Sequence, residues 1–416
     1  MYLWDWSLIC LQDYDILVVG GGPAGATAAH FLGQNGLKVL LIDKSAFPRD
    51  KPCGGGISVR IVRRFPYLDD ELKRIPVNWV GRVYLESPAG ISLHYDSDRP
   101  LYLMIRRYDF DNLLYTLAGR SVDITQGLIR KLAQGPDGVA ISTSDGREFH
   151  AKLVIGADGA NSFVARASGL RRGNVRHEYA IDMMEETPYQ KLDVADRKTM
   201  YVYYGIHGHY GYGWIFPKCN YINLGVGFKL DYYMDRLSGN HYDHHSWFVE
   251  QLQSQRVVTG SSDPGAFKAF PIPVAGPLPC TYVNRVLLCG DAGGFVNAFT
   301  AEGIYYAMVS GECAAKTALD AVMHKDFSSS RLQHYEELWK SEIGAELQKS
   351  VSIQRVLLSD TTRIDRIVKA AGRNKALAHL LTQYATGGIS YPDFKRSLVL
   401  HAFPLYIWEK VKSLVS

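Results

Sequence analysis

A glycine-rich turn near the start of the chain constrains the fold more than any other feature. Residues 14–19 form a continuous apolar run, typical of a buried parallel strand, and the Ala-rich residues 24–32 predict a helix. Between them, Gly20, Gly22 and Gly25 match the pattern G-x-G-x-x-G. In this pattern one glycine makes the tight turn, one lets a pyrophosphate approach the backbone, and one packs the helix on the strand. The helix N-terminus would then present free N–H groups to phosphates.

The residues that follow decide between a nucleotide site and an ordinary strand–helix–strand unit. A second apolar strand is predicted over 38–42 and ends in Asp43. Asp43 follows the first glycine at close to the roughly 20 residues expected for a carboxylate that binds a ribose. Strand, helix and acid together favour a dinucleotide site, and an acid at this position favours a ribose with a free hydroxyl.

Length and composition exclude several classes of protein. A chain of 416 residues is expected to hold two or three domains or one large interwoven domain, and its net charge of +4 does not favour nucleic acid binding. The six cysteines show no C-x-x-C spacing, which argues against a zinc site or disulfide framework and fits a reducing cytosol. Residues 1–12 lack the features of a signal peptide, and no apolar run is long enough to span a bilayer. Membrane contact, if any, is therefore expected to be peripheral.

A second glycine cluster, Gly54 to Gly56, follows soon after Asp43. Glycines that are not needed for a turn suggest backbone lying close to a flat ligand. Cys53 precedes the cluster, and two interpretations of it remain open. A single cysteine is often a small buried apolar residue, but the neighbouring Lys51 and free N–H groups would stabilise a thiolate.

Three later segments return to the predicted nucleotide domain. A strand over 101–105 precedes Arg107, which either reaches phosphates or is solvated, and a helix is predicted from about 109 to 117. An apolar strand over 153–156 ends near Asp158. Another strand, over 285–289, precedes Asp291, which can accept hydrogen bonds from ligand hydroxyls. The N–H groups of Gly303 and Ile304, which open a small-residue helix, can stabilise negative charge.

Residues 173–275 are rich in aromatic and β-branched side chains, and a hairpin over 79–95 is predicted to join them. Tyr212, Trp214 and Phe216 fall at alternate positions and therefore on one face of a strand. This sheet is either an ordinary packed core or one side of a long apolar pocket.

From about residue 328 the chain is predicted to be helical to its end. Residues 361–416 contain nine Lys and Arg against three Asp and Glu, and residues 394–415 mix such charges with large apolar side chains. This composition suits docking on an anionic membrane surface, and it equally suits a solvated helical cap over the second domain.

Together these motifs resemble the geranylgeranyl reductase family of flavoproteins, within the p-hydroxybenzoate hydroxylase-like class. The resemblance covers residues 14–318. It rests on the glycine turn with Asp43, on Lys51-Pro52-Cys53-Gly54-Gly55-Gly56, on the stretch 107–114, on Gly290-Asp291-Ala292, and on Ala301-Glu302-Gly303-Ile304. The segments 212–217 and 225–227 also look like the substrate-domain signature of the family.

The resemblance implies non-covalent FAD and assigns residues to it. Gly20 to Gly25 would hold the pyrophosphate, Asp43 the adenosine ribose, Arg107 the phosphates or ribose, and Asp291 the ribityl chain. Gly303 and Ile304 would present N–H groups to the pyrimidine edge of the flavin, and Cys53 to Gly56 would line its reacting face. The full expected cofactor set is Gly20, Gly22, Ala24, Gly25, Asp43, Lys44, Cys53, Gly54, Gly55, Gly56, Arg107, Ile129, Asp158, Asp291, Gly303 and Ile304.

The implied reaction is saturation of isolated C=C bonds in a polyprenyl group by hydride from reduced flavin, with a proton from an acid. The substrate would be a prenyl-chain lipid, a prenylated quinone or a prenyl diphosphate. Cys53, Tyr212 and Trp214 are the candidate catalytic residues. The electron donor would be NADPH, ferredoxin or another low-potential reductant, so a redox donor protein is a possible partner.

Two other functions remain open on the sequence. An aromatic monooxygenase or halogenase of the same fold is one, but the stretch 51–54 counts against it. So does Tyr212, which stands where the halogenase pattern W-x-W-x-I-P has its first Trp. A flavin electron carrier without substrate chemistry is the other, and it should lack a closed apolar tunnel.

The expected fold is α/β, with a Rossmann-like FAD-binding domain, an inserted antiparallel-sheet substrate domain and a C-terminal helical region. The FAD-binding domain is predicted to be discontinuous, comprising residues 1–78, 101–172 and 276–325. Residues 79–100 and 173–275 would form the substrate domain, and 326–416 the helical domain. The protein is expected to be cytoplasmic, either free or peripherally bound to a membrane through its C-terminal helices.

Overall fold

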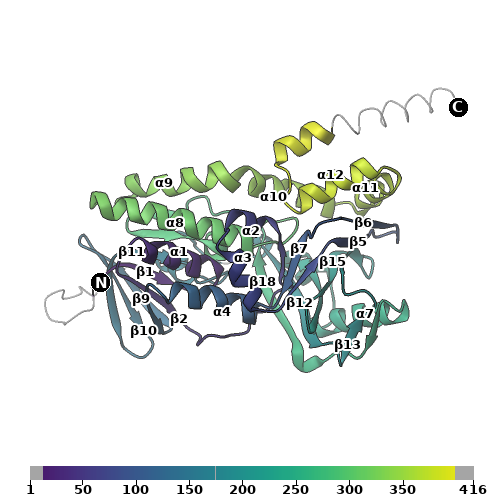
Figure 1. The fold of residues 1–416 in the computed structure, drawn as a ribbon, viewed down its shortest axis with the longest axis horizontal. Coiled ribbons are helices and arrows are strands. Elements are labelled where there is room, and N and C mark those ends of the chain that lie inside the picture. The colour runs from purple at the N-terminus through teal and green to yellow at the C-terminus, as the bar shows by residue number, and fades with distance from the viewer. Residues whose placement is uncertain (1–12, 174, 399–416) are drawn as a thin grey trace.

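The computed structural model describes residues 13–173 and 175–398. Two large sheets lie side by side along the molecule, and a row of helices from the C-terminal third covers one side of both (Figure 1). The predicted α/β fold class, with its C-terminal helical region, is confirmed.

The sheet that follows the expected nucleotide-binding topology has eight strands. Their bounds are β1 (Asp13–Val19), β2 (Val39–Asp43), β8 (Asp123–Gln126), β9 (Ile129–Gln134), β10 (Val139–Thr143), β11 (Glu148–Gly156), β19 (Tyr282–Val283) and β20 (Val286–Leu288). Strands β20, β11, β1, β2 and β8 run parallel in that order, and β19 and β10 add antiparallel pairs. The glycine turn, Asp43, Asp158 and Asp291 all follow carboxyl ends of these parallel strands. They are therefore brought to one edge of the sheet, where ligands of such folds bind.

Helices cover one face of this sheet and a hairpin covers the other. The helical face carries α1 (Pro23–Gln34), α4 (Arg107–Ala118), α8 (Ile304–His324) and α9 (Ser329–Trp339). On the opposite face, side chains of β9 and β10 pack with the short α5 (Phe163–Ala167). Helix α1 packs tightly on α8 because both present small residues. A Cβ at Gly311 of α8 would lie only 2.3 Å from the carbonyl oxygen of Ala24.

A small third sheet, which no sequence pattern indicated, links the two large ones. It pairs β3 (Gly56–Ser58) and β4 (Val77–Val80) with β7 (Tyr102–Ile105), and between β3 and β4 the chain forms α2 (Arg60–Arg64), α3 (Leu68–Glu71) and a 3-10 turn (Leu72–Arg74). Trp79, expected in a hairpin over 79–95, belongs to β4 of this sheet. The hairpin itself begins at Arg82.

The second large sheet contains the aromatic segment. Its seven strands are β5 (Arg82–Glu86), β6 (Ser92–Asp96), β12 (Tyr179–Pro188), β14 (Thr199–Ile206), β15 (His209–Pro217), β16 (Tyr221–Lys229) and β18 (Phe267–Pro273). They lie in the order β18, β12, β16, β15, β14, β5, β6, and all neighbours are antiparallel except β14 with β5. One face packs on α6 (Leu230–Arg236) and α7 (His241–Ser254), beside the ribbon of β13 (Leu192–Val194) and β17 (Val258–Gly260). The other face is directed toward the cavity described below.

The C-terminal region is helical as far as the structure describes it. A π-turn (Lys340–Gly344) joins α9 to α10 (Ala345–Leu358), followed by α11 (Thr361–Arg373) and α12 (Lys375–Ala385). Helices α11 and α12 pack on β6 around Ala371, Leu377 and Ala378. Most of the stretch 394–415, for which membrane docking was considered, lies outside the described residues. Within residues 13–398, leaving out 174, no helix has both the length and the apolar character needed to cross a membrane.

Candidate functional site

One large cavity, of about 1290 Å³, extends from the glycine turn to the C-terminal helices. Of the predicted cofactor residues, all except Gly25 line it. The aromatic stripe Tyr212, Trp214 and Phe216 lines it too. The fold therefore gathers into one continuous space residues that are up to 284 positions apart, from Gly20 to Ile304.

The backbone of the glycine turn leaves space for a ligand at one position and none at two others. Gly20 has φ +105°, and a Cβ there would lie 2.3 Å from the carbonyl oxygen of Ala157. A Cβ at Gly25 would lie 1.9 Å from the carbonyl oxygen of Gly20, so this glycine packs the helix on the strand. At Gly22 a Cβ would meet only Arg49 Nη2, at 3.6 Å. The open side of the turn is therefore at Gly22.

Asp43 holds the glycine turn in place as well as lining the cavity. Its Oδ2 accepts a hydrogen bond from the Gly21 N–H at 2.7 Å, and its Oδ1 accepts one from the Ser45 N–H at 2.8 Å. A carboxylate has further lone pairs, so a ribose hydroxyl can still donate to it. Asp158 already has local hydrogen-bond partners. Its carboxylate accepts hydrogen bonds from Ser162 Oγ and from the N–H groups of Phe163 and Val164 at the start of α5.

Two arginines lie near the turn, and their roles differ. Arg107, expected to reach phosphates, is buried in a bidentate pair with Asp111, with distances of 2.6 and 2.7 Å. Burial disfavours its charge, but Asp111 outweighs this effect and raises the pKa of Arg107. Arg49, which was not among the predicted site residues, forms an ion pair with Asp111 at 3.1 Å and lies beside Gly22. Its Nη1 is buried without a hydrogen-bond partner among the described residues.

These features fit a dinucleotide. A backbone turn that is open at one glycine and a buried guanidinium N–H without a partner are what a pyrophosphate would fill and satisfy. The sequence signal for Arg49 was weak because it is one basic residue in a loop, without a motif of its own.

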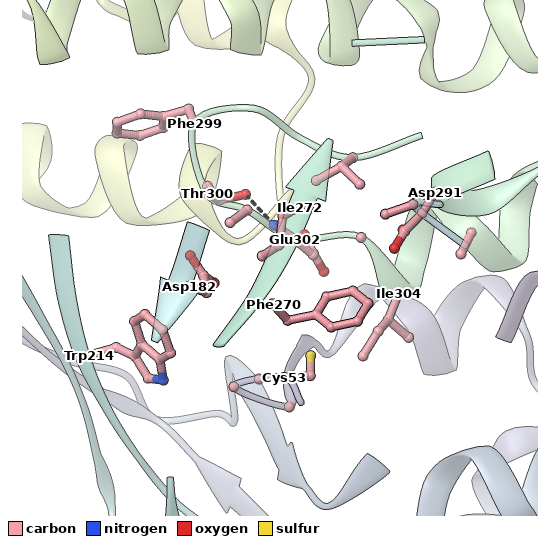
Figure 2. Close-up of a pocket in the computed structure, with 18 of the residues that line it drawn as sticks. Cys53, Asp182, Trp214, Phe270, Ile272, Asp291, Phe299, Thr300, Glu302 and Ile304 are labelled. Carbon is pink, nitrogen blue, oxygen red and sulfur yellow. Dashed lines mark hydrogen bonds between the residues drawn. The ribbon is translucent and has the colours of Figure 1, made fainter. Parts of the chain in front are cut away.

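At the other end of the nucleotide region, Asp291 and the start of α8 lie together (Figure 2). A Cβ at Gly303 would lie 3.5 Å from Asp291 Oδ1. Gly303 is the N-cap of α8 and Ile304 its first residue, so their N–H groups have no partner within the helix. A carboxylate acceptor beside helix N–H donors suits a ligand that carries both hydroxyls and a polar carbonyl edge.

The loop of Cys53 is held against the second sheet by its glycines and by one amide. A Cβ at Gly54 would lie 2.8 Å from the Phe216 ring. Trp214 Nε1 donates to Asn223 Oδ1 at 2.8 Å, and Asn223 Nδ2 donates to the Cys53 carbonyl at 3.2 Å. The indole N–H of Trp214 is therefore engaged in positioning this loop. Asn223 was missed, because no motif marks a buried amide in a strand.

Tyr212 and a second missed residue, Asp182, form a buried pair in the same region. The Tyr212 hydroxyl donates to Asp182 Oδ1 at 2.7 Å. Burial raises the pKa of Asp182 to about 7, against the lowering effects of the Tyr212 bond and of Lys51. The pKa of Tyr212 lies well above its ordinary value because of burial and the neighbouring Asp182. Asp182 lies between apolar neighbours in β12, and no motif in the sequence marks it.

Beyond these residues the cavity becomes apolar. Side chains from β5, β6 and β14 contribute, and so do apolar residues of α10, α11 and α12 and Phe299 from the loop before α8. The strand and helix residues are Val83, Leu85, Leu93, Met200, Val202, Tyr204, Ile353, Leu357, Ile364, Val368, Leu377 and Leu381. Of the sequence alternatives for the aromatic sheet, the structure shows both. Tyr203 packs in the core under α7, whereas Tyr204 and Tyr212 line the cavity.

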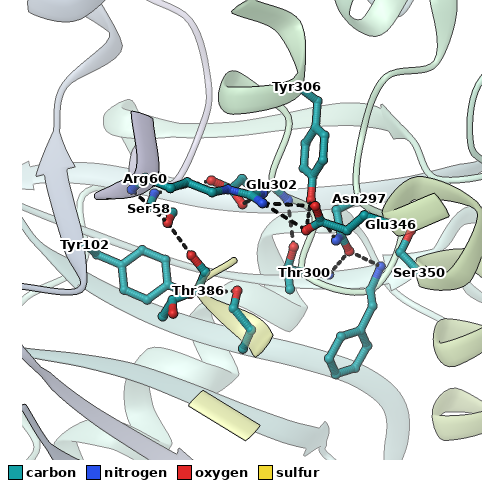
Figure 3. A network of polar contacts seen from close by, with 12 residues as sticks. Ser58, Arg60, Tyr102, Asn297, Thr300, Glu302, Tyr306, Glu346, Ser350 and Thr386 are labelled. Atoms are coloured by element: carbon teal, nitrogen blue, oxygen red, sulfur yellow. Dashed lines mark hydrogen bonds and ion pairs between the residues drawn. The ribbon is translucent and has the colours of Figure 1, made fainter. Parts of the chain in front are cut away.

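A buried polar network fastens the C-terminal helices over this apolar part (Figure 3). Arg60 pairs with Glu302 at 3.1 Å and with Glu346 of α10 at 3.0 Å, and Tyr306 donates to Glu346 at 2.5 Å. The Ser58 hydroxyl donates to the Thr386 carbonyl just after α12. Burial raises the pKa of Glu302, and the Arg60 charge opposes this shift. The network therefore joins the N-terminal end of α8 to the helices that enclose the cavity.

Comparison with known proteins agrees with this site. Residues 13–341 match the family described as "FAD binding domain". The chain is 30% identical over 374 residues to a digeranylgeranylglycerophospholipid reductase of Methanocaldococcus jannaschii, covering 87% of this chain and 91% of the relative. This chain belongs to the geranylgeranyl reductase family of FAD-binding flavoproteins. FAD is accordingly its cofactor.

Further relatives and solved structures are consistent with the family. A digeranylgeranylglycerophospholipid reductase of Methanopyrus kandleri is 29% identical, over 87% of this chain and 98% of that one. A geranylgeranyl bacteriochlorophyll reductase-like structure from Thermoplasma acidophilum has a TM-score of 0.80 at 23% identity, covering 93% and 99% of the two chains. A flavin-dependent brominase has a TM-score of 0.73 at 18% identity, covering 94% and 100%. These two structures share the fold.

Proposed function

We propose that this chain is an FAD-dependent oxidoreductase that saturates C=C bonds of a geranylgeranyl or similar polyprenyl chain carried on a lipid, a quinone or a diphosphate. The observation that carries the proposal is the single cavity in which a dinucleotide site opens directly into a long apolar space. The names of the relatives, which are reductases of digeranylgeranylglycerophospholipid, support a prenyl lipid as the substrate.

Different residues along the cavity would bind different parts of the cofactor and the substrate. Gly20, Gly22 and Arg49 would hold the pyrophosphate, Asp43 the adenosine ribose, and Asp291 with the N–H groups of Gly303 and Ile304 the far end of the cofactor. Reduced FAD supplies hydride. The glycines of 54–56 would let backbone lie against the flavin, and the apolar side chains would hold the prenyl chain and exclude water.

Cys53, Tyr212 and Trp214 remain the proposed catalytic residues, with a distinction that the contacts support. Trp214 is a positioning residue, because its indole N–H is bonded to Asn223. Cys53 and Tyr212 line the cavity where the nucleotide region meets the apolar region. NADPH, ferredoxin or another low-potential reductant would supply the electrons. The basic residues of α11 and of the sequence after it would favour peripheral contact with an anionic membrane.

A flavin-dependent halogenase or monooxygenase is the second candidate, because a brominase shares the fold with a TM-score of 0.73. The apolar length of the cavity and Tyr212 in place of the first halogenase Trp favour the reductase instead. A flavin electron carrier would not need an apolar space of this size.

Mass spectrometry of an anaerobic reaction separates these candidates. The FAD-loaded protein is reduced with dithionite and mixed with a geranylgeranyl glycerolipid, and the lipid is then extracted. We expect a gain of two hydrogens per double bond. An unchanged lipid, together with NADPH consumption that an aromatic substrate stimulates in air, would overturn the reductase and favour the monooxygenase.

A further inference from the structure

Asp182 is a carboxyl group at the point where the nucleotide region of the cavity meets the apolar region (Figure 2). Its side chain lies in β12 and the residue is only 5% exposed. Its hydrogen bond comes from the Tyr212 hydroxyl, and no ion pair within 4.0 Å holds it among the described residues. A buried carboxyl group in such surroundings needs an explanation, since burial of an unpaired charge is costly.

The other carboxyl groups that line the cavity have hydrogen-bond or ion-pair partners, lie on the cofactor side, or, in the case of Asp50, are exposed to solvent. Asp43 accepts two backbone N–H bonds at the glycine turn. Asp158 caps α5. Glu302 is paired with Arg60. Asp291 lies beside the start of α8, on the cofactor side. Asp182, by contrast, lies among Tyr212, Trp214 and Phe270, next to the Cys53 loop.

We propose that Asp182 is the acid that protonates the alkene, with the Tyr212 hydroxyl positioning its carboxyl group. This inference rests on the proposed reductase function and assigns the proton donor of that reaction. One alkene carbon receives hydride from the reduced cofactor, and the other receives the proton of Asp182. The π bond is replaced by two C–H bonds, its electron pair and that of the hydride being used in them. The cofactor is left oxidised and Asp182 is left as a carboxylate.

The surroundings of Asp182 suit both of these protonation states. Because burial raises its pKa to about 7, the carboxyl group is largely neutral below that pH and can act as an acid. The carboxylate formed in the reaction keeps the Tyr212 hydrogen bond and is attracted by Lys51, and both favour the charged form. Lys51 is held over the Phe270 ring at 3.4 Å. Solvent or the next reductive cycle then returns the proton.

Tyr212 itself is a poor acid in this place. Its pKa is raised well above the ordinary value by burial and by Asp182. Its proton is donated toward Asp182 Oδ1, which leaves Oδ2 of the carboxyl group to carry the reacting proton. Tyr212 is therefore a positioning residue in this step.

The pH dependence follows from the groups that face this pair. They are Lys51 and Cys53 from the loop after β2, Tyr212 from β15 and Tyr204 from β14, with Gly227 of β16 and Phe270 of β18 as the register neighbours. The pKa of Lys51 is lowered by burial to about 8. The acid is lost as pH rises through about 7, so saturation should slow tenfold for each further pH unit. Removing the Tyr212 hydroxyl raises the pKa of Asp182, because that bond favours the carboxylate.

The test is a single-turnover reaction of the dithionite-reduced holoenzyme with a geranylgeranyl glycerolipid under anaerobic conditions. Asp182→Asn keeps an oxygen that can accept from Tyr212, and it should retain FAD and its reduction by dithionite. It should lose about 10²- to 10⁴-fold in the rate at which the lipid reoxidises the flavin. Asp137→Asn, the same change at an exposed acid that does not line the cavity, should leave that rate unchanged.

Three further measurements separate a chemical role from a structural one. Infrared difference spectra recorded below the Asp182 pKa of about 7 should show a protonated carboxyl C=O band that is absent from Asp182→Asn. Tyr212→Phe should move the alkaline limb of the wild-type rate profile to higher pH. Asp182→Glu should recover part of the activity lost in Asp182→Asn.

The outcomes distinguish this inference from the function on which it rests. Wild-type turnover combined with a fully active Asp182→Asn, or an unshifted pH profile in Tyr212→Phe, would overturn the role of Asp182 alone. A wild-type enzyme that saturates no prenyl lipid would overturn the proposed function and this proton transfer with it.

Discussion

The two ends of the cavity are built in different ways. At the cofactor end, the backbone itself forms the surface, at the carboxyl ends of parallel strands and at the first turn of α8. At the apolar end, the surface consists of side chains from an antiparallel sheet and from helices α10 to α12. The first construction depends on the absence of side chains at a few positions, and the second depends on the presence of many.

This difference predicts how each end responds to change. The backbone surface cannot adjust at Gly20 or Gly25, because an added methyl group there would meet another backbone atom. A surface of large apolar side chains can repack, so single changes there are partly absorbed. The network of Arg60 and the Cys53 loop lie between the two ends, and single substitutions there should have effects of intermediate size.

The largest effect is expected at Gly25. In Gly25→Ala the added methyl would lie 1.9 Å from the carbonyl oxygen of Gly20, so the strand and helix must separate. The purified variant should contain no FAD by its visible absorbance and should unfold at a lower temperature. Gly372→Ala, in α11 with nothing within 4 Å of its Cβ, is the matched control and should retain FAD and wild-type stability or better. Full FAD content in Gly25→Ala would contradict the backbone construction.

Much of the cofactor end could be predicted from the sequence, for the same reason that Gly25 is sensitive. Gly20, Gly22, Asp43 and Asp291 follow strands at short, fixed spacings, so local pattern and spatial position coincide. Strands β1 and β2 and helix α1 accordingly match their predicted segments within a few residues. The three-stranded sheet was not predicted, because β3, β4 and β7 are short and pair across long separations.

The apolar end could be predicted only as a choice of alternatives. The alternation of Tyr212, Trp214 and Phe216 fixed their common face, but whether that face is core or cavity depends on which helices cover it. Asp182 and Asn223 escaped notice because their importance comes from partners that are distant in sequence: Tyr212 is 30 residues from Asp182, and Cys53 is 170 from Asn223. A single sequence contains no local pattern that reveals such pairings.

The next largest effect is expected at Arg60. Arg60→Ala leaves Glu302 and Glu346 without their cation, and breaking a buried ion pair in this way costs about 3–5 kcal/mol. The free energy of unfolding in urea should fall by that amount, and proteolysis should occur between α10 and α12. Adding Glu302→Gln to Arg60→Ala should restore part of the loss, since it removes one uncompensated charge. Lys73→Ala, which breaks an exposed pair with Asp70, should show no measurable change.

A smaller and more local effect is expected at Asp291. Asp291→Ala removes the acceptor that we propose for cofactor hydroxyls, and hydrogen bonds to a charged group contribute about 1.5–3 kcal/mol. The dissociation constant of FAD, measured by fluorescence titration of the apoprotein, should rise by roughly 10- to 150-fold while the fold is kept. An unchanged dissociation constant would remove Asp291 from the cofactor site, although the geometry of the glycine turn would still account for binding.

The smallest effect is expected at Trp214, where the two constructions meet. Trp214→Phe keeps an aromatic ring against Gly54 but removes the donor to Asn223, so one link to the Cys53 carbonyl is weakened. A typical hydrogen bond contributes about 1 kcal/mol, and FAD should stay bound because no part of the glycine turn changes. Asn223→Leu should lower the free energy of unfolding by a similar amount. The double variant should lose no more of that free energy than the more destabilised single variant, because both changes act through one chain of contacts. Additive losses in that cycle would mean that Trp214 acts on the cavity directly, as a surface for substrate, rather than through the position of the Cys53 loop.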